Sequence, residues 1–139
     1  MLNAGQTAEP KPMALDPSTP ILVVDDYRTM LRIVRCLLVQ AGFTDVDEAI
    51  DGEEALAKMR DRKYGLVLSD WHMEPTSGMD LLAEAKADEA LRDTPFVMIS
   101  AEAAAENVAA AEAAGARGYI VKPFDAETLR ARIDLACAA

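Results

Sequence analysis

Five short runs of residues, separated by stretches with helical periodicity, limit what this chain can fold into more than any other feature. Most of these runs are apolar throughout rather than alternating, as expected of strands that are buried on both faces. A helix after each strand is typical of a parallel sheet with helices on both of its faces. The predicted strands cover residues 21–24, 46–49, 66–68, 96–99 and 118–121, of which 46–49 is the weakest.

The stretches between the predicted strands carry signals for the ends of helices. Asp51, Ser77 and Asp125 precede helical patterns and are typical N-cap residues. Gly42 and Gly115 follow helical patterns and are typical of helix C-termini. With right-handed crossovers, these units predict a doubly wound α/β fold. We expect a five-stranded parallel sheet in the order 2-1-3-4-5 with five helices, a flavodoxin-like three-layer sandwich.

The chain has 139 residues, which suits one domain with one core. Residues 1–19 carry three prolines among small and polar residues and lack the pattern of a signal peptide. We therefore expect a disordered N-terminal tail over 1–19 and one folded domain over 20–139. No apolar run approaches the roughly 20 residues that span a membrane.

The charge balance bears on the kind of partner. The chain has 14 Lys and Arg residues against 24 Asp and Glu residues, a net charge of -10. This acidity argues against binding to nucleic acid or to an anionic membrane, and it suits a metal cation or a basic protein surface as partner. Cys36 and Cys137 have no metal-like spacing. They are expected to be free thiols, which favours a cytoplasmic location. The protein is expected to be a soluble monomer.

Polar residues stand directly after four of the predicted strands. Asp25 and Asp26 follow the first strand and Asp70 follows the third, whereas Ser100 follows the fourth and Lys122 the fifth. In the predicted order these strands are neighbours, and sites in such sheets form outside the carboxyl ends of the strands. The five side chains should therefore converge in one cleft.

The chemistry of this set indicates a metal and a phosphoryl group. Three carboxylates close together repel one another unless a cation lies among them. Oxygen ligands without His or Cys suit Mg²⁺, and Lys122 with the Ser100 hydroxyl suits phosphoryl oxygens. A carboxylate can also act as a nucleophile and form an aspartyl phosphate. Asp70, on the central strand, is the best placed nucleophile, with Asp26 as the direct metal ligand and Asp25 acting on a metal-bound water.

The stretches VVDD, LSDWHM, MISAE and GYIVKPF resemble the receiver domain of two-component response regulators. The resemblance covers about residues 20–137, and five separated functional positions match in order. Within this family the chain is most similar to the single-domain chemotaxis regulators of the CheY type, through stretches such as AGFTDVDEAIDGEEAL and KADEAL. The resemblance implies a CheY-like receiver fold for the whole predicted domain.

The resemblance also implies a role for each acidic position. Asp70 would accept a phosphoryl group from a histidine kinase. Asp26 and Asp70 would bind Mg²⁺ together with the backbone carbonyl of His72. Asp25 would hold the ion through a water molecule.

A switch is implied in the same way. Ser100 would bond the phosphoryl group and follow it on activation, and Lys122 would pair with that group. Tyr119 would swing inward as Ser100 moves. This would remodel the face of the fourth helix, fifth strand and fifth helix, to which a protein output target would bind. Lys122–Pro123 would be a cis peptide bond.

Two positions depart from the pattern of the CheY type. His72 stands where those sequences often have Asn, whereas Glu102 matches them. Both residues are expected beside the phosphoryl site, where they would change the phosphoryl lifetime. Pro75 comes one position later than usual, so the path of the loop after His72 is expected to differ. Trp71 is the only tryptophan and offers a fluorescent reporter beside Asp70.

The expected function is that of a phosphorylation-activated receiver without an attached output domain, which is not an enzyme with a separate substrate. The CheY likeness points to chemotaxis and to the flagellar motor switch as output target. One alternative is a stand-alone receiver that shuttles phosphate in a phosphorelay or modulates a histidine kinase.

Two more distant alternatives use the same residues. A Mg²⁺-dependent phosphohydrolase of the haloacid dehalogenase type also has an Asp nucleophile, but its two aspartates typically lie two apart, whereas Asp25 and Asp26 are adjacent. A degenerate receiver that no longer takes phosphate is disfavoured, because all five site positions are intact.

Overall fold

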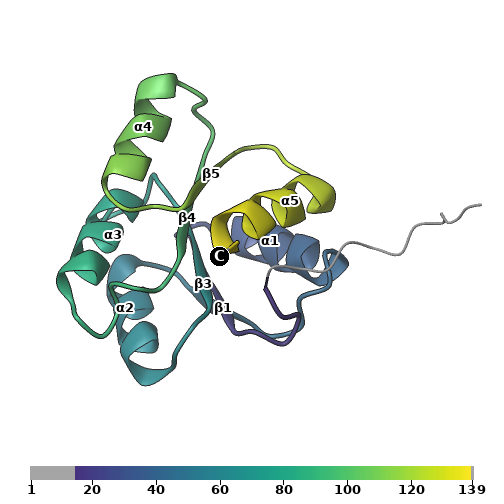
Figure 1. Ribbon diagram of the computed structural model, residues 1–139, viewed down its shortest axis with the longest axis horizontal. Coiled ribbons are helices and arrows are strands. Elements are labelled where there is room, and N and C mark those ends of the chain that lie inside the picture. The colour runs from purple at the N-terminus through teal and green to yellow at the C-terminus, as the bar shows by residue number, and fades with distance from the viewer. Residues whose placement is uncertain (1–14, 139) are drawn as a thin grey trace, which may run out of the picture.

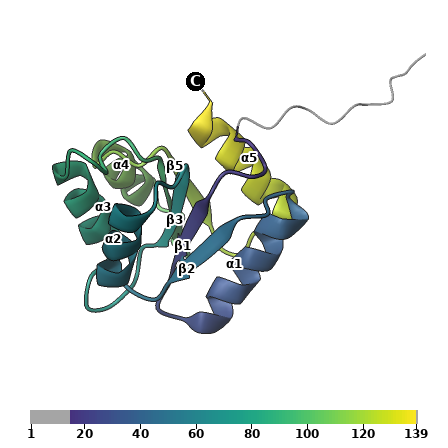
Figure 2. The same ribbon diagram turned by 90° about the horizontal axis from the view of Figure 1, so that it is seen from below.

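The computed structural model describes residues 15–138 and confirms the predicted three-layer α/β fold (Figure 1). The sheet is parallel with the strand order β2-β1-β3-β4-β5. Helices α1 and α5 cover one face of the sheet, and α2, α3 and α4 cover the other (Figure 2). The elements are β1 (Ile21–Val24), α1 (Arg28–Gln40), β2 (Val46–Ala49), α2 (Gly52–Asp61), β3 (Leu66–Asp70), α3 (Gly78–Ala87), β4 (Phe96–Ser100), α4 (Ala105–Ala113), β5 (Gly118–Val121) and α5 (Ala126–Cys137).

The core is divided by the sheet into two apolar layers. Alternate residues of a strand point to opposite faces, so Leu22 and Val24 of β1 pack towards α2 and α3, whereas Ile21 and Val23 pack towards α1 and α5. All residues of β1, β3 and β4 are buried. This burial on both faces is the physical reason why these strands are apolar throughout.

The predicted helix signals are confirmed. The side chains of Asp51 and Asp125 accept hydrogen bonds from backbone N–H groups three residues on, each at 2.8 Å. Ser77 forms a capping box with Asp80 at the start of α3. Gly42 and Gly115, at φ angles of 108° and 106°, end α1 and α4 in a conformation that favours glycine.

The predicted tail lies only partly within the described residues. Leu15 packs against the core layer under α1 and α5, and the backbone carbonyl of Pro17 accepts a hydrogen bond from the N–H of Thr44 at 3.1 Å. Residues 1–14 of the predicted tail lie outside the described part, and the boundary at residue 19 stays a prediction. None of the described helices is long and apolar enough to cross a membrane.

Gly78 lets the start of α3 approach the end of β3. Its N–H donates to the carbonyl of Trp71 at 2.9 Å, and a Cβ at this position would lie 2.2 Å from the carbonyl oxygen of Asp70. No side chain fits at that distance without a shift of the backbone. Gly78 therefore holds the chain close behind Asp70.

We expect Gly78→Ala to lower the free energy of unfolding by about 1–3 kcal/mol, because the added methyl group overpacks against backbone. Urea denaturation measures the change. Gly118→Ala is the matched control, since a Cβ there meets its nearest side-chain atom at an ordinary 3.4 Å. Equal destabilisation by both substitutions would contradict this role of Gly78.

Candidate functional site

The parallel sheet brings the polar residues at the strand ends to one edge. Asp25 follows β1, Asp70 ends β3, Ser100 ends β4 and Lys122 follows β5, and these four strands are neighbours in the sheet. Asp25 and Asp70 are only 4% and 6% exposed, and Ser100 is 1% exposed. The strand ends that carry these residues therefore lie together at one edge, with two acidic groups held almost out of water.

The three aspartates form a compact cluster of oxygen donors. One carboxylate oxygen from each of Asp25, Asp26 and Asp70 lies within 4.8 Å of the others. Asp26 is exposed, so the cluster opens to solvent on its side. A donor set made only of carboxylate oxygens, with room left for water, fits a hard cation such as Mg²⁺.

Electrostatics supports the same conclusion. Burial raises the pKa of Asp25 to about 6. The negative charge of Asp70 also raises this pKa, whereas a hydrogen bond of 2.9 Å from the N–H of Tyr27 to the carboxylate lowers it. The protein thus holds Asp25 in a place where its charged form is disfavoured. A cation among the carboxylates would offset that cost.

Lys122 supplies the positive charge of the site. Its Nζ lies 2.7 Å from Oδ1 of Asp70 and 3.9 Å from Oδ2 of Asp25. The backbone N–H of Lys122 donates to the carbonyl of Ser100 at 2.8 Å. The Lys122–Pro123 peptide bond is cis, as predicted. Lys122 is therefore aimed at the carboxylate that was predicted to be the nucleophile.

Glu102 connects Ser100 with Tyr119. Its N–H donates to Oγ of Ser100 at 3.1 Å, and its carbonyl accepts from the hydroxyl of Tyr119 at 2.6 Å. The Tyr119 side chain is buried, and its ring makes an edge contact with Trp71 at 6.0 Å between centroids. In this structure Tyr119 thus lies inward, and its proposed movement stays a prediction.

His72 and Glu102 approach each other across the loops that follow β3 and β4. His72 Nε2 lies 3.3 Å from a carboxylate oxygen of Glu102, and both side chains are more than half exposed. The sequence analysis missed this pair and the contact between Trp71 and Tyr119. A signal for the pair was present, because each partner stands two residues beyond the end of neighbouring strands, after Asp70 and Ser100.

The loop after His72 contains a second cis peptide bond, Glu74–Pro75, which the sequence analysis did not predict. The N–H of Glu74 donates to Oδ2 of Asp26 at 3.3 Å. The Glu74–Pro75 segment, which departs from the CheY-type pattern, therefore contacts Asp26, a candidate metal ligand.

Comparisons with known proteins agree with this geometry. The family model of the response regulator receiver domain matches residues 21–134. The chain is 45% identical over 120 residues to the chemotaxis protein CheY-3 of Vibrio cholerae, covering 86% of this chain and 92% of the relative. It is 42% identical over 114 residues to the chemotaxis protein CheY of Pseudomonas aeruginosa, covering 82% and 92%.

Solved structures give the same result for the fold. The structure of the chemotaxis response regulator CheY4 of Vibrio cholerae superposes with a TM-score of 0.74 at 33% identity, covering 81% of this chain and 92% of that one. A putative response regulator from Chloroflexus aurantiacus superposes with a TM-score of 0.81 at 26% identity, covering 88% and 99%.

We expect Mg²⁺ to change the fluorescence of Trp71 in a saturable way, because the ion would bind beside its neighbour Asp70. The substitution Asp26→Ala should remove most of the response. Asp61→Ala, at the exposed C-terminal end of α2, removes the same charge far from the cluster and should leave the response intact. A flat titration of the unsubstituted protein would count against a metal at this site.

Proposed function

Because the chain belongs to the response regulator receiver family, we propose that it is a phosphorylation-activated receiver of two-component signalling, with Asp70 as phosphoacceptor and Mg²⁺ as cofactor. The observation that carries the proposal is the position of Lys122, 2.7 Å from Asp70 and beside the three-carboxylate cluster. In this role the protein carries a signal in its own phosphorylation state and has no separate substrate to turn over.

Asp70 and Lys122 have different roles in the proposed phosphotransfer. An oxygen of Asp70 attacks the phosphorus of a phosphohistidine on the donor kinase, and the P–N bond breaks as the P–O bond forms. The electron pair of the broken bond stays on the histidine nitrogen. Lys122 leaves the Asp70 carboxylate and pairs with an oxygen of the incoming phosphoryl group.

The acidic cluster would hold the metal. Asp26, Asp70 and the backbone carbonyl of His72 are the proposed direct ligands, and Asp25 is proposed to act through a water molecule. Bound Mg²⁺ would neutralise charge on the phosphoryl oxygens as they approach the carboxylates. The exposed position of Asp26 leaves that side of the cluster open to an incoming group.

Ser100 and Tyr119 are the proposed link to the output. The Ser100 hydroxyl would donate to a phosphoryl oxygen, and this change would act on Glu102, whose N–H is bonded to the same hydroxyl. Because the carbonyl of Glu102 also holds Tyr119, the change would reach β5 and the helices beside it. This face is the proposed surface for an output protein.

Chemotaxis is the proposed pathway, with the flagellar motor switch as output target. Its support is the similarity to relatives named as chemotaxis proteins at 42–45% identity, each covered over 92% of its length. The histidine kinase that would donate phosphate acts at Asp70 in this proposal.

We expect incubation with acetyl phosphate and Mg²⁺ to add one phosphoryl group, seen in the intact mass of the protein. Asp70→Ala should abolish the addition because it removes the attacking oxygen. Lys122→Ala should slow the addition by about 10²-fold. A positive charge that is already in place where negative charge develops in the reaction typically contributes this much to the rate. Asp61→Ala serves as the control. Addition that survives Asp70→Ala would refute the proposed phosphoacceptor.

His72 and Glu102 are proposed to lengthen the phosphoryl lifetime, because their contact joins the loops that follow β3 and β4 beside Asp70 and would restrict the approach of water. An exposed pair contributes up to about 1 kcal/mol, so Glu102→Gln should speed phosphoryl loss by about two- to fivefold. The decay of the phosphorylated mass after removal of the donor measures this rate. Glu106→Gln, an exposed change in the first turn of α4, is the matched control, and equal decay in both variants would contradict the role.

A further inference from the structure

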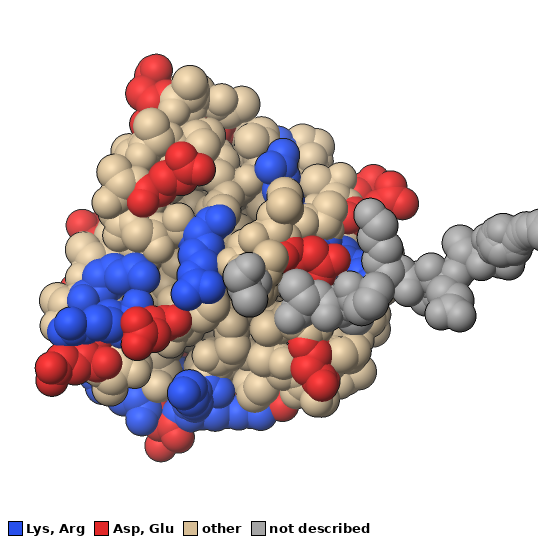
Figure 3. Space-filling model, in the orientation of Figure 1, with Lys and Arg blue, Asp and Glu red and all other residues tan. Residues whose placement is uncertain are grey.

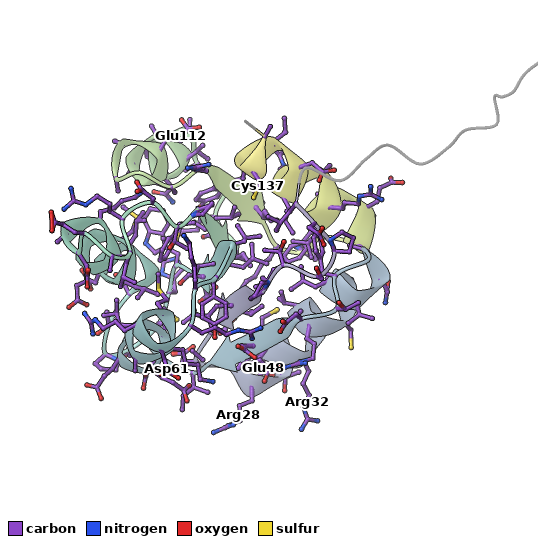
Figure 4. The ribbon with its side chains drawn as sticks, turned by 60° about the horizontal axis from the view of Figure 1, so that its bottom comes forward. Arg28, Arg32, Glu48, Asp61, Glu112 and Cys137 are labelled. Atoms are coloured by element: carbon purple, nitrogen blue, oxygen red, sulfur yellow. The ribbon has the colours of Figure 1, made fainter. Side chains whose placement is uncertain are left out.

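Most charged side chains of this protein lie at its surface. On the face that Figure 3 shows, acidic and basic side chains are interspersed, and Figure 4 shows Arg32 of α1 pointing into solvent. Among residues 15–138, the buried polar side chains other than those of tyrosine belong to Asp25, Ser69, Asp70 and Ser100. Three of these four residues form the acidic site at the strand ends. Ser69 is the one that has no role in the proposed phosphotransfer.

Ser69 lies in an apolar layer of the core. It is 0% exposed and directly precedes Asp70 in β3. The register pairs it with Val24 of β1 and Met98 of β4, which both belong to the apolar layer under α2 and α3. An alanine would occupy the same place without a polar atom. A hydroxyl group buried in such a layer needs a hydrogen bond to offset its lost hydration.

The Ser69 hydroxyl bonds to the backbone of the next residue. Its Oγ donates to the carbonyl oxygen of Asp70 at 3.0 Å. The same carbonyl oxygen lies close to Gly78, where a Cβ would come within 2.2 Å of it. The peptide unit between Asp70 and Trp71 is therefore held by a hydrogen bond and confined by the backbone at the start of α3.

The next carbonyl along the chain is held as well. The carbonyl of Trp71 accepts a hydrogen bond from the N–H of Gly78 at 2.9 Å. The third carbonyl, that of His72, is the proposed backbone ligand of Mg²⁺. Two held peptide units thus precede the one that would bind the ion. Because each peptide unit is planar and joined to the next at a single Cα, their orientation helps to decide where the His72 carbonyl points.

Ser69 and Ser100 use their buried hydroxyl groups differently. The Oγ of Ser100 accepts a hydrogen bond from the N–H of Glu102 at 3.1 Å, so its own proton can be donated to a phosphoryl oxygen. The proton of Ser69 is donated to a carbonyl within the same strand. Ser69 is therefore suited to hold the backbone in place rather than to bind the phosphoryl group.

We propose that Ser69 is a positioning residue for the metal site. Its hydroxyl fixes the peptide unit after Asp70, and thereby the Asp70 carboxylate and the His72 carbonyl. Both groups then face the acidic cluster before the ion binds. Ligands that are already oriented bind a metal more tightly, because less ordering has to take place on binding. The inference rests on the proposed function, which makes these groups ligands of Mg²⁺.

The first test is a titration of the full chain with Mg²⁺, followed by the fluorescence of Trp71. Ser69→Ala removes the hydroxyl with little change in shape. It should raise the dissociation constant for Mg²⁺ about tenfold, at the lower end of the effect of losing a hydrogen bond behind a metal ligand. An unchanged dissociation constant would overturn the proposal.

Two further substitutions separate positioning from stability, which urea denaturation measures. Ser69→Thr keeps the hydroxyl and should bind Mg²⁺ as the unsubstituted chain does, although its extra methyl group overpacks the layer and lowers the free energy of unfolding. Val67→Ala, on the same face of β3, opens a cavity and lowers stability, but it leaves the hydroxyl and the Asp70 carbonyl in place. It should also bind Mg²⁺ normally. If either variant bound Mg²⁺ as weakly as Ser69→Ala, binding would follow stability and the proposal would be overturned.

The state of the peptide unit can be measured by NMR without metal. A hydrogen bond to a carbonyl oxygen polarises the peptide unit that accepts it. Ser69→Ala should therefore shift the amide nitrogen resonance of Trp71, whereas Val67→Ala and Ser69→Thr should leave it near its original position. No shift in Ser69→Ala, or an equal shift in Val67→Ala, would contradict the proposed role of the hydroxyl.

Phosphoryl addition from acetyl phosphate separates a failure of this inference from a failure of the proposed function. Ser69→Ala should take the phosphoryl group more slowly, and the deficit should be larger at low Mg²⁺ than at saturating Mg²⁺. If Ser69→Ala weakened Mg²⁺ binding but the unsubstituted chain took no phosphoryl group, the proposed function would be refuted and the positioning role supported. Normal phosphoryl addition with equal Mg²⁺ binding by both proteins would overturn the positioning role alone.

Discussion

The burial of two carboxylates at one edge of the sheet is the constraint on which the rest of this structure depends. Asp25 and Asp70 are nearly inaccessible, and Asp26 brings a third acidic group within reach of both. Lys122 lies close to Asp70 and farther from Asp25, and it is the one cation among the described residues that forms an ion pair with this cluster of three anions. This imbalance favours the binding of a divalent cation beside the carboxylate that an incoming phosphoryl group would meet.

The fold is what makes such a cluster possible. A parallel sheet directs all its carboxyl strand ends to one side, and four neighbouring strands here deliver polar residues where they leave the core. The apolar layers on both faces hold the strands in register, and the close approach at Gly78 holds the start of α3 behind Asp70. The packed sheet thus positions the buried residues of the site, while the loops after β3 and β4 carry the exposed residues His72 and Glu102.

The same site is connected to a distant surface through few contacts. The N–H of Glu102 donates to the hydroxyl of Ser100, and its carbonyl accepts a hydrogen bond from the hydroxyl of Tyr119. Its carboxylate lies beside the ring of His72. Tyr119 in turn belongs to β5, the edge strand that lines a groove between α4 and α5. These contacts join the ends of β3 and β4 to β5, whereas at the opposite edge the backbone of β2 and of the residue after it bonds to Lys58 and Glu54.

The sequence alone determined the fold, the strand order and the set Asp25, Asp26, Asp70, Ser100 and Lys122, because apolar periodicity, helix caps and strand ends are local signals. The cis bond at Lys122–Pro123 was expected only from the family resemblance. The contact of His72 with Glu102, the ring contact of Trp71 with Tyr119 and the cis bond at Glu74–Pro75 were decided by the tertiary structure. The residue pairs among these features join parts of the chain far apart in sequence, and their geometry follows from how loops and helices pack on the finished sheet.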